Sequence, residues 1–205
     1  MTGRKNATQK FASNGKCYQI LSRQSGKAIG VDEDGTLLIM CTPDPSALSQ
    51  SWKLETAEDG FCRIFNTASG KAVDVINGGT GNGAWLHQWP PCDADSQLWK
   101  LEPASSRGCY RFLSKASGKC MDIVDISSEE GAHLQIWDSL DGENQEWKLV
   151  AITDGAEAPK ATAPKRRRSS TRRNTRQTTA PAKANRALKQ PAAESTATLK
   201  PEKTE

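Results

Sequence analysis

One short pattern occurs three times in the first 150 residues of this chain. Each copy contains Ser-Gly-Lys, at 25–27, 69–71 and 117–119, and each ends in Gln-x-Trp-Lys-Leu, at 50–54, 97–101 and 145–149. The repeat therefore takes up about 45 residues, which is too few to bury an apolar face alone. A repeat of this period predicts a single structure in which the three copies pack on one another.

The local pattern inside each copy has a period of two residues. Trp147 and Leu149 alternate with Lys148, and within 133–137 Leu134 and Ile136 alternate with polar or outward positions. This alternation is typical of half-buried strands. Turn sequences such as those at 117–118 and 141–142 separate the short strands, and no segment carries a convincing helical stripe. The prediction is an all-β structure.

Three equivalent β-units can close around an axis. A β-trefoil closes in this way and leaves no exposed sheet edge, whereas a three-bladed propeller falls below the usual number of blades. We therefore expect a β-trefoil with pseudo-threefold symmetry over residues 10–152, preceded by a flexible N-terminus at 1–9.

The three Gln-x-Trp motifs, in register and each preceded by Ser-Gly-Lys and an apolar strand, resemble those of the ricin B-type lectins. That family has the β-trefoil fold, and the resemblance covers roughly residues 10–152. It implies that Trp52, Trp99 and Trp147 belong to the core. It also implies that the Gln of each motif supports a neighbouring site Asp.

The resemblance further implies a sugar site built from outward groups of one copy: an Asp, a polar residue two positions before an aromatic residue, that aromatic residue, and an Asn before the motif Gln. An aromatic ring stacks on the apolar face of a pyranose, while carboxylate and amide groups bind its hydroxyls. The third copy contains every part. We expect galactose-type sugars to bind Asp122, Gln135, Trp137, Asn144 and Gln145.

The second copy is incomplete. His87 replaces the Gln and Ser96 replaces the Asn, so the expected weaker site consists of Asp74, His87, Trp89 and Gln97. A weak site and a decayed site whose Trp89 merely covers surface remain open alternatives. Trp85 is also outward, where it could widen a sugar platform or pack under a loop.

The first copy lacks both the carboxylate and the ring. At the four places of the site it has Gly30, Met40, Thr42 and Ser49. We expect this copy not to bind sugar.

No catalytic or metal site is expected. Acidic pairs such as Asp122 with Asp125, or Glu129 with Glu130, could in principle serve glycoside hydrolysis, but neighbouring acids on turns are usually solvated surface. The sequence has no Cys-x-x-Cys pair and only two histidines, which disfavours a zinc site. We expect a protein that is not an enzyme and has no cofactor.

Cysteine positions and the absence of a leader sequence suggest an intracellular protein. The resemblance implies one disulfide per copy in secreted relatives, but here Cys41, Cys92 and Cys120 lack the second half of each pair. No apolar run is long enough to serve as a secretion signal or a transmembrane segment. We expect free thiols and a cytoplasmic location, with a nuclear one possible through the basic tail.

The end of the chain differs in charge from the rest. Residues 1–150 contain 15 Lys and Arg against 19 Asp and Glu, a net charge of −4, whereas residues 151–205 contain 13 against 5, a net charge of +8. Residues 153–205 have little apolar bulk and are expected to be disordered. The basic residues cluster at Lys165, Arg166, Arg167, Arg168, Arg172, Arg173 and Arg176.

Two functions follow. The first is a non-enzymatic lectin for glycans of the galactose or N-acetylgalactosamine type, with the third copy as the main site. The alternative is a trefoil interaction module with degenerate sugar sites, whose basic tail binds nucleic acid or anionic membrane. An import signal or a tail that only keeps the protein soluble would leave the same sequence pattern.

Overall fold

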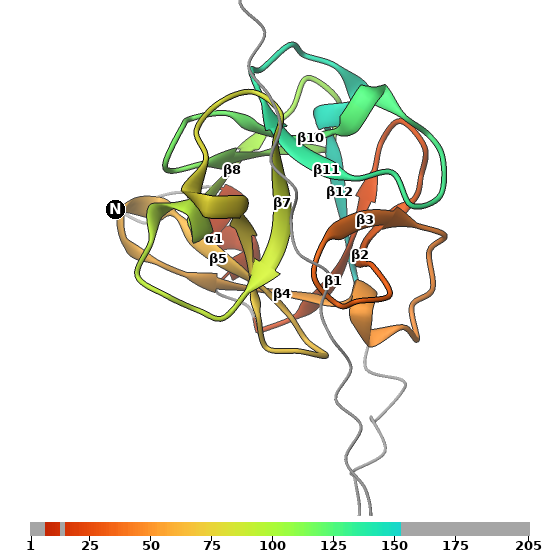
Figure 1. Ribbon diagram of the computed structural model, residues 1–205, viewed down its shortest axis with the longest axis horizontal. Coiled ribbons are helices and arrows are strands. Elements are labelled where there is room, and N and C mark those ends of the chain that lie inside the picture. Colours follow the sequence, from red (N-terminus) through yellow and green to blue (C-terminus); the bar gives the residue numbers. More distant parts are fainter. Residues whose placement is uncertain (1–6, 13–14, 153–205) are drawn as a thin grey trace, which may run out of the picture. The chain divides into compact units, whose positions relative to one another are not determined.

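Twelve short strands form the part of the chain that the computed structural model describes, residues 7–12 and 15–152 (Figure 1). The elements are α1 (Ala7–Ala12), β1 (Cys17–Ser22), β2 (Ala28–Val31), β3 (Leu38–Cys41), β4 (Trp52–Thr56), β5 (Cys62–Asn66), β6 (Ala72–Val75), β7 (Ala84–Trp89), β8 (Trp99–Pro103), β9 (Tyr110–Ser114), β10 (Cys120–Ile123), β11 (Leu134–Trp137) and β12 (Trp147–Ala151). Short 3-10 turns interrupt them at Leu48–Gln50, Glu58–Gly60, Ile76–Gly78, Asp95–Gln97, Val124–Ile126 and Glu143–Gln145.

The strands follow the three sequence copies, with β1–β4 in the first, β5–β8 in the second and β9–β12 in the third. Antiparallel pairing joins β4 to β5, β8 to β9 and β12 to β1, and within each copy the first strand also pairs with the fourth. These six strands close a barrel. The remaining strands form three hairpins, β2–β3, β6–β7 and β10–β11. This is the predicted β-trefoil.

The three hairpins meet at one end of the barrel. In Figure 1, β3, β7 and β11 surround the centre of the view. Trp85 pairs with Gln135, Leu37 with His87, and Ile39 with His133. Each hairpin therefore places an outward residue beside the outward face of the next copy.

The core consists of the inward residues of all three copies. The motif tryptophans are its largest members, and Trp52, Trp99 and Trp147 have no exposed surface. Their indole Nε1 atoms donate to the backbone oxygens of Ile29, Val73 and Met121. Each motif Trp thus ties the barrel to the hairpin of its own copy, and the predicted core role is confirmed.

A short helix spans the boundary predicted between residues 9 and 10. Residues 7–9, assigned to the flexible N-terminus, begin helix α1, and Thr8 Oγ1 accepts a hydrogen bond of 2.8 Å from the Leu101 amide. Phe11 packs edge-on against Tyr18 and Tyr110, with ring centroids 5.4 and 4.9 Å apart. A six-residue helix is too short to show a clear period in the sequence. The contacts of Phe11 with the barrel therefore hold this segment in place.

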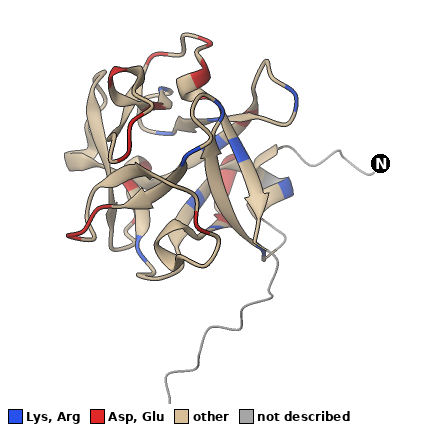
Figure 2. Ribbon diagram, turned by 90° about the vertical axis from the view of Figure 1, so that its right-hand side faces the viewer, with Lys and Arg blue, Asp and Glu red and all other residues tan. Residues whose placement is uncertain are grey.

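Charged residues are spread over the trefoil. Figure 2 shows acidic and basic positions interspersed on the face it presents. Several are paired, including Lys27 with Glu130 at 2.7 Å and Lys115 with Asp95 at 2.8 Å. Within the described residues, no helix is both long and apolar enough to cross a membrane.

Candidate sugar-binding site

The hairpin and the 3-10 turn of each copy bring its outward groups together. We call these groups site 1, site 2 and site 3 after the copy that supplies them. Site 3 consists of Asp122 from β10, Gln135 and Trp137 from β11, and two residues of the turn Glu143–Gln145, namely Asn144 and Gln145. Asp122 and Gln135 lie directly opposite each other in the strand pair.

Three side-chain amides of site 3 converge on one carboxylate. Gln135 Nε2 donates to Asp122 Oδ1 at 2.8 Å. Asn144 Nδ2 and Gln145 Nε2 donate to Asp122 Oδ2 at 2.6 and 2.9 Å. Because a carboxylate has about four acceptor positions, this arrangement leaves Asp122 able to accept from one ligand hydroxyl.

The polar groups of site 3 are recessed rather than fully outward. Asp122 is only 4% exposed, and Gln135, Asn144 and Gln145 are also buried, whereas Trp137 is half-buried. Burial raises the pKa of the Asp122 carboxyl above its ordinary value, and hydrogen bonds from Gln135 and Gln145 partly offset that increase. The structure brings the predicted residues together and shows how deeply the carboxylate lies, which the sequence did not reveal.

A loop of the second copy borders site 3. Asn82 Nδ2 donates to Asp138 Oδ2 at 2.8 Å, and the Asp138 amide donates back to Asn82 Oδ1 at 3.1 Å. Lys119 also binds the Asp138 carboxylate, and the hydrogen bonds from Lys119 and Asn82 lower the pKa of Asp138. Sequence reasoning assigned none of these three residues to the site.

Two glycines border site 3, one with a positive φ and one in close contact with a site residue. A Cβ on Gly83 would lie 3.8 Å from Trp137 Cζ3 and 3.9 Å from Gln135 Oε1, and the φ of Gly83 is +86°. A Cβ on Gly142 would collide with Asn144 Oδ1. The sequence marked both glycines as turn residues, but only the fold shows that they border a site.

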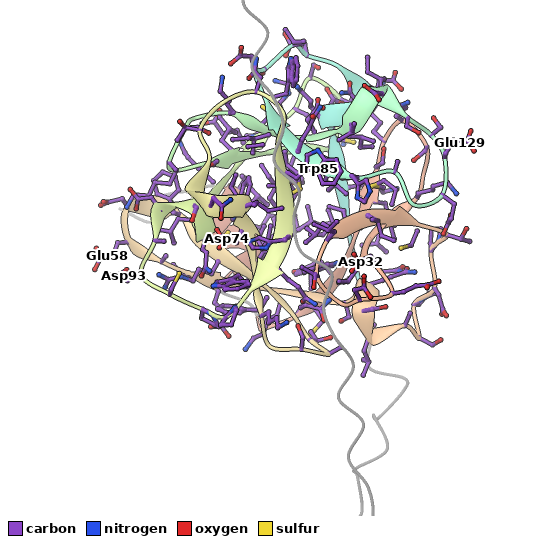
Figure 3. All side chains as sticks on the ribbon, viewed as in Figure 1. Asp32, Glu58, Asp74, Trp85, Asp93 and Glu129 are labelled. Carbon is purple, nitrogen blue, oxygen red and sulfur yellow. The ribbon has the colours of Figure 1, made fainter. Side chains whose placement is uncertain are left out.

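Site 2 has a different hydrogen-bond pattern. Gln97 Nε2 donates to Asp74 Oδ2 at 3.2 Å, while His87 Nε2 lies 3.6 Å from the same oxygen. Among the described residues, Asp74 Oδ1 and His87 Nε2 have no hydrogen-bond partner although both are buried. Trp89 is 52% exposed and stacks on His87, with centroids 5.4 Å apart. Figure 3 labels Asp74 beside β7.

Ser96 accounts for part of this difference. It occupies the place of Asn144 and is buried, but its hydroxyl is too short to replace an amide that reaches the carboxylate. Site 2 therefore presents a carboxylate oxygen and an imidazole nitrogen that a ligand could satisfy.

Two of the four positions predicted for site 1 are wrong by one residue. Pairing of β2 with β3 places Ile39 opposite Gly30 and Cys41 opposite Ala28, so Ile39 and Cys41 occupy the places assigned to Met40 and Thr42. Met40 is in the core. The first copy is three residues shorter, which makes its register ambiguous in sequence. Gly30 and Ser49 are equivalent to Asp122 and Asn144.

Site 1 has no room for an acidic side chain. A Cβ on Gly30 would lie 2.6 Å from Cys41 Sγ. Thr42 instead binds Glu130 of the third copy through both its amide and its hydroxyl, at 2.8 and 2.9 Å. The hydrogen bond from Lys27 and those from Thr42 lower the pKa of Glu130 to about 2.

The Gln of each motif has a second, structural role. Gln50, Gln97 and Gln145 donate to the backbone oxygens of Thr42, Pro90 and Asp138, at 2.9, 3.1 and 2.8 Å. Each also accepts a backbone amide through Oε1. The motif Gln therefore holds the loop that follows β3, β7 or β11, and in sites 2 and 3 it also supports the Asp that the resemblance implied.

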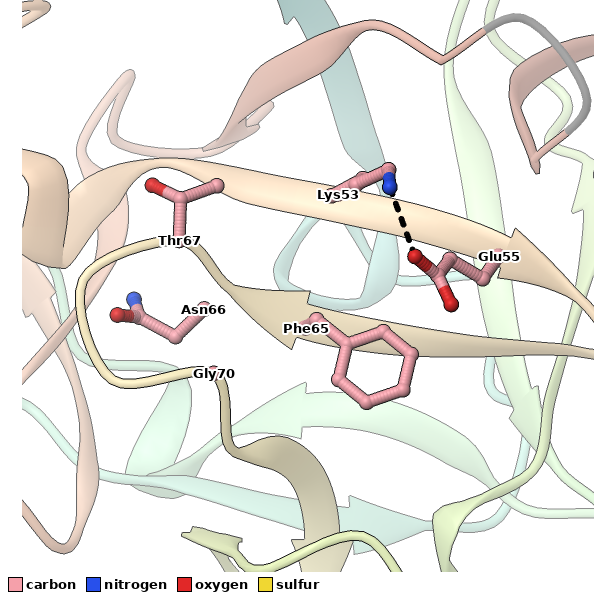
Figure 4. A pocket seen from close by; sticks show the side chains of 6 residues that line it. All are labelled: Lys53, Glu55, Phe65, Asn66, Thr67 and Gly70. Carbon is pink, nitrogen blue, oxygen red and sulfur yellow. Dashed lines mark hydrogen bonds and ion pairs between the residues drawn. The ribbon is translucent and has the colours of Figure 1, made fainter.

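A separate hollow lies between β4 and β5. It has a volume of about 350 Å³ and is lined by Lys53, Glu55, Phe65, Asn66, Thr67 and Gly70 (Figure 4). Lys53 is paired with Glu55 at 2.8 Å, and the side-chain amide of Asn66 donates to the backbone oxygen of Ser49. Its charged and amide groups are already satisfied, so the hollow offers a ligand less than sites 2 and 3 do. Within 7–12 and 15–152, no group of His, Cys, Asp and Glu could hold a metal ion.

All six cysteines lie in the described part of the chain and are unpaired: Cys17, Cys41, Cys62, Cys92, Cys109 and Cys120. The basic residues of the tail, from Lys165 to Arg176, and the disorder expected for 153–205 lie outside the described residues.

Comparison with known proteins places these sites in context. The family model described as "Ricin-type beta-trefoil lectin domain-like" matches residues 7–89 and 95–158. No curated protein matches the sequence.

Solved structures share the fold. The designed threefold-symmetric protein ThreeFoil is 32% identical, with a TM-score of 0.62 over 65% of this chain and 97% of its own. The exo-β-1,3-galactanase 1,3Gal43A from Clostridium thermocellum is 31% identical, with a TM-score of 0.63 over 69% of this chain but only 31% of its own. The Macrolepiota procera ricin B-like lectin, solved with lactose, is 17% identical, with a TM-score of 0.58 over 66% of this chain and 94% of its own.

Proposed function

The chain belongs to the ricin-type β-trefoil lectin-like family, and from this premise we propose that it is a non-enzymatic lectin that binds galactose-type sugars chiefly through site 3. The observation that carries the proposal is the convergence of Gln135, Asn144 and Gln145 on Asp122 beside Trp137. The ring offers a stacking surface for the apolar face of a pyranose. The Asp122 carboxylate accepts a hydrogen bond from a sugar hydroxyl with its remaining lone pair.

The choice of galactose-type sugars has support from related structures. The Macrolepiota procera lectin was solved with lactose, and an earthworm R-type lectin that is 19% identical was solved with GalNAc. The galactanase contains a trefoil region like this chain, but the match covers 31% of that enzyme. Its catalytic activity is therefore not part of the proposal.

Titration calorimetry of the full chain with galactose, lactose and N-acetylgalactosamine tests the proposal. A site with one stacked ring should bind a monosaccharide weakly, with a Kd of about 1 mM. Asp122→Asn removes the charged acceptor and Trp137→Ala removes the stacking surface. We expect either change to weaken binding at least about tenfold.

Two matched variants serve as controls. Asp125→Asn makes the same acid-to-amide change at an exposed position on the neighbouring turn and should not alter binding. Trp89→Ala removes the ring of site 2 and should lower binding only modestly. If Trp89→Ala abolishes binding while Asp122→Asn and Trp137→Ala do not, site 2 is the main site; if the parent binds no glycan, the lectin proposal fails.

A variant with Arg166, Arg167 and Arg168 replaced by Gln distinguishes sugar binding by site 3 from binding by the basic tail. Sugar binding by site 3 should be unchanged in this variant. Loss of sugar binding with these arginines would instead assign the interaction to the tail.

A further inference from the structure

An exposed tryptophan from the second copy lies beside site 3. Trp85 of β7 pairs directly with Gln135 of β11, which itself pairs with Asp122 of β10. Residues directly opposite each other in neighbouring strands point to the same face. Trp85, Gln135 and Asp122 therefore form one row across three strands on the outward face, and Trp85 lies about 10 Å from Asp122 at two strand spacings.

The strand position that faces Trp137 on the β7 side carries no side chain. Trp137 is two residues along β11 from Gln135, so it is the diagonal neighbour of Trp85. The position on the β7 side that faces Trp137 is Gly83, whose amide donates to the Ile136 oxygen at 3.0 Å. Because glycine has no side chain, nothing from this position blocks a ligand that extends from Trp137 toward Trp85.

The Trp85 ring is both held in place and accessible. It stacks on His133, with centroids 4.4 Å apart and planes at 19°. The side chain nevertheless remains 40% exposed, and Figure 3 shows it near the point where the three hairpins meet. Because His133 covers one face of the indole, a ligand would stack on the opposite face.

This arrangement is specific to site 3. The equivalent neighbour of site 2 is Leu37, which lies opposite His87, and the equivalent neighbour of site 1 is His133, which lies opposite Ile39. Leu37 has no flat aromatic face, and site 1 has no carboxylate. Only site 3 combines a complete polar cluster with an indole from the next copy.

We propose that Trp85 is a second stacking platform of site 3, and that the preferred ligand is a galactose-containing oligosaccharide of at least two residues rather than a monosaccharide. One sugar stacks on Trp137 and binds Asp122, and the adjoining sugar stacks on Trp85. This proposal rests on the proposed function of site 3 and adds the length of its ligand.

Calorimetry of the full chain with galactose, β-1,3-galactobiose, β-1,3-galactotriose and lactose tests the proposal. At least one of the oligosaccharides should bind the parent about tenfold more tightly than galactose, as expected for one additional aromatic stack. Trp85→Ala should remove this difference and leave galactose affinity within about twofold of the parent. Trp137→Ala should weaken both classes of ligand.

Two further variants separate stacking from folding. Trp85→Leu reproduces the arrangement beside site 2 and keeps an apolar contact with His133, so it should fold like the parent. It should nevertheless lose the preference for oligosaccharides over galactose. Leu37→Ala changes the equivalent position beside site 2 and should keep the preference. Equal affinity of the parent for galactose and all the oligosaccharides would overturn the proposal. So would a Trp85→Leu variant whose affinities for galactose and for the oligosaccharides fall by the same factor. If the parent binds none of these sugars, the proposed function itself fails and this extension fails with it.

Discussion

Gln145 donates its side-chain amide to Asp122 across 2.9 Å, between residues 23 positions apart in the sequence. The same amide donates to the backbone oxygen of Asp138 across 2.8 Å. The residue that opens the third Gln-x-Trp motif therefore connects the carboxylate of the site to the loop that follows Trp137. In the same motif, Trp147 anchors the core. The motif thus couples the stability of the copy to the geometry of its site.

Gln145→Ala should weaken both folding and sugar binding. The change removes one of the three donors to the buried Asp122 carboxylate, the donor to the Asp138 backbone oxygen and the acceptor of the Leu140 amide. The free energy of unfolding should therefore fall by about 1–3 kcal/mol. Urea denaturation followed by tryptophan fluorescence measures the loss. Gln97→Ala is the matched control, because it should cost similar stability while leaving binding at site 3 intact. A Gln145→Ala protein with parental stability would contradict the bonding described here.

Sugar binding should weaken as the pH falls, with a midpoint above the ordinary Asp value of 3.8, because burial raises the pKa of Asp122. The ionised carboxylate accepts the ligand hydroxyl, and protonation removes this charged acceptor. A carboxyl whose pKa is higher in the folded state binds its proton more tightly there, so protonation of Asp122 does not itself favour unfolding. Calorimetry across the acidic range, with circular dichroism to monitor folding, should show that affinity is lost before structure. A binding midpoint below 3.8 would contradict this prediction.

Phe11→Ala should destabilise the trefoil although it lies near the N-terminus. Phe11 is only 8% exposed and contacts the rings of Tyr18 and Tyr110. Removal of a buried aromatic side chain costs about 3–5 kcal/mol, and this position at the edge of the core should fall near the lower value. Thermal and urea unfolding measure the change. Lys10→Ala, on the exposed side of α1, is the control and should cost much less; equal stability of Phe11→Ala and parent would mean that α1 does not contribute to the core.

The cysteines should differ strongly in their reactivity. Cys92 is exposed, whereas burial raises the pKa of Cys62 to about 12 and also raises that of Cys120. Because the thiolate is the reactive form, a thiol reagent at about pH 8 should label Cys92 first and Cys62 only after unfolding. Mass spectrometry of peptides from the native and denatured protein shows the order. Rapid native labelling of Cys62 would contradict its position in the core.

Much of site 3 could be predicted from local sequence. The period of two places its β11 residues on the outward face, and the resemblance to the ricin B-type lectins implies that they form a site with Asp122, Asn144 and Gln145. The first copy is ambiguous in sequence, and the prediction puts Met40 and Thr42 where the structure has Ile39 and Cys41. A shift of one residue turns a strand's outward set inward, and only the pairing of β2 with β3 resolved it.

The repeat, the alternation of the strands and the inward position of the three motif tryptophans can be read from the sequence, because they depend on residues close together in one copy. Which residues of different copies lie side by side follows only from the closed fold. Closure around the pseudo-threefold axis sets Trp85 against Gln135 and Asn82 against Asp138, and it buries Asp122 beneath partners from separate elements. No periodicity within a copy encodes these contacts, because strand pairing between copies and the packing of the closed barrel bring the residues together.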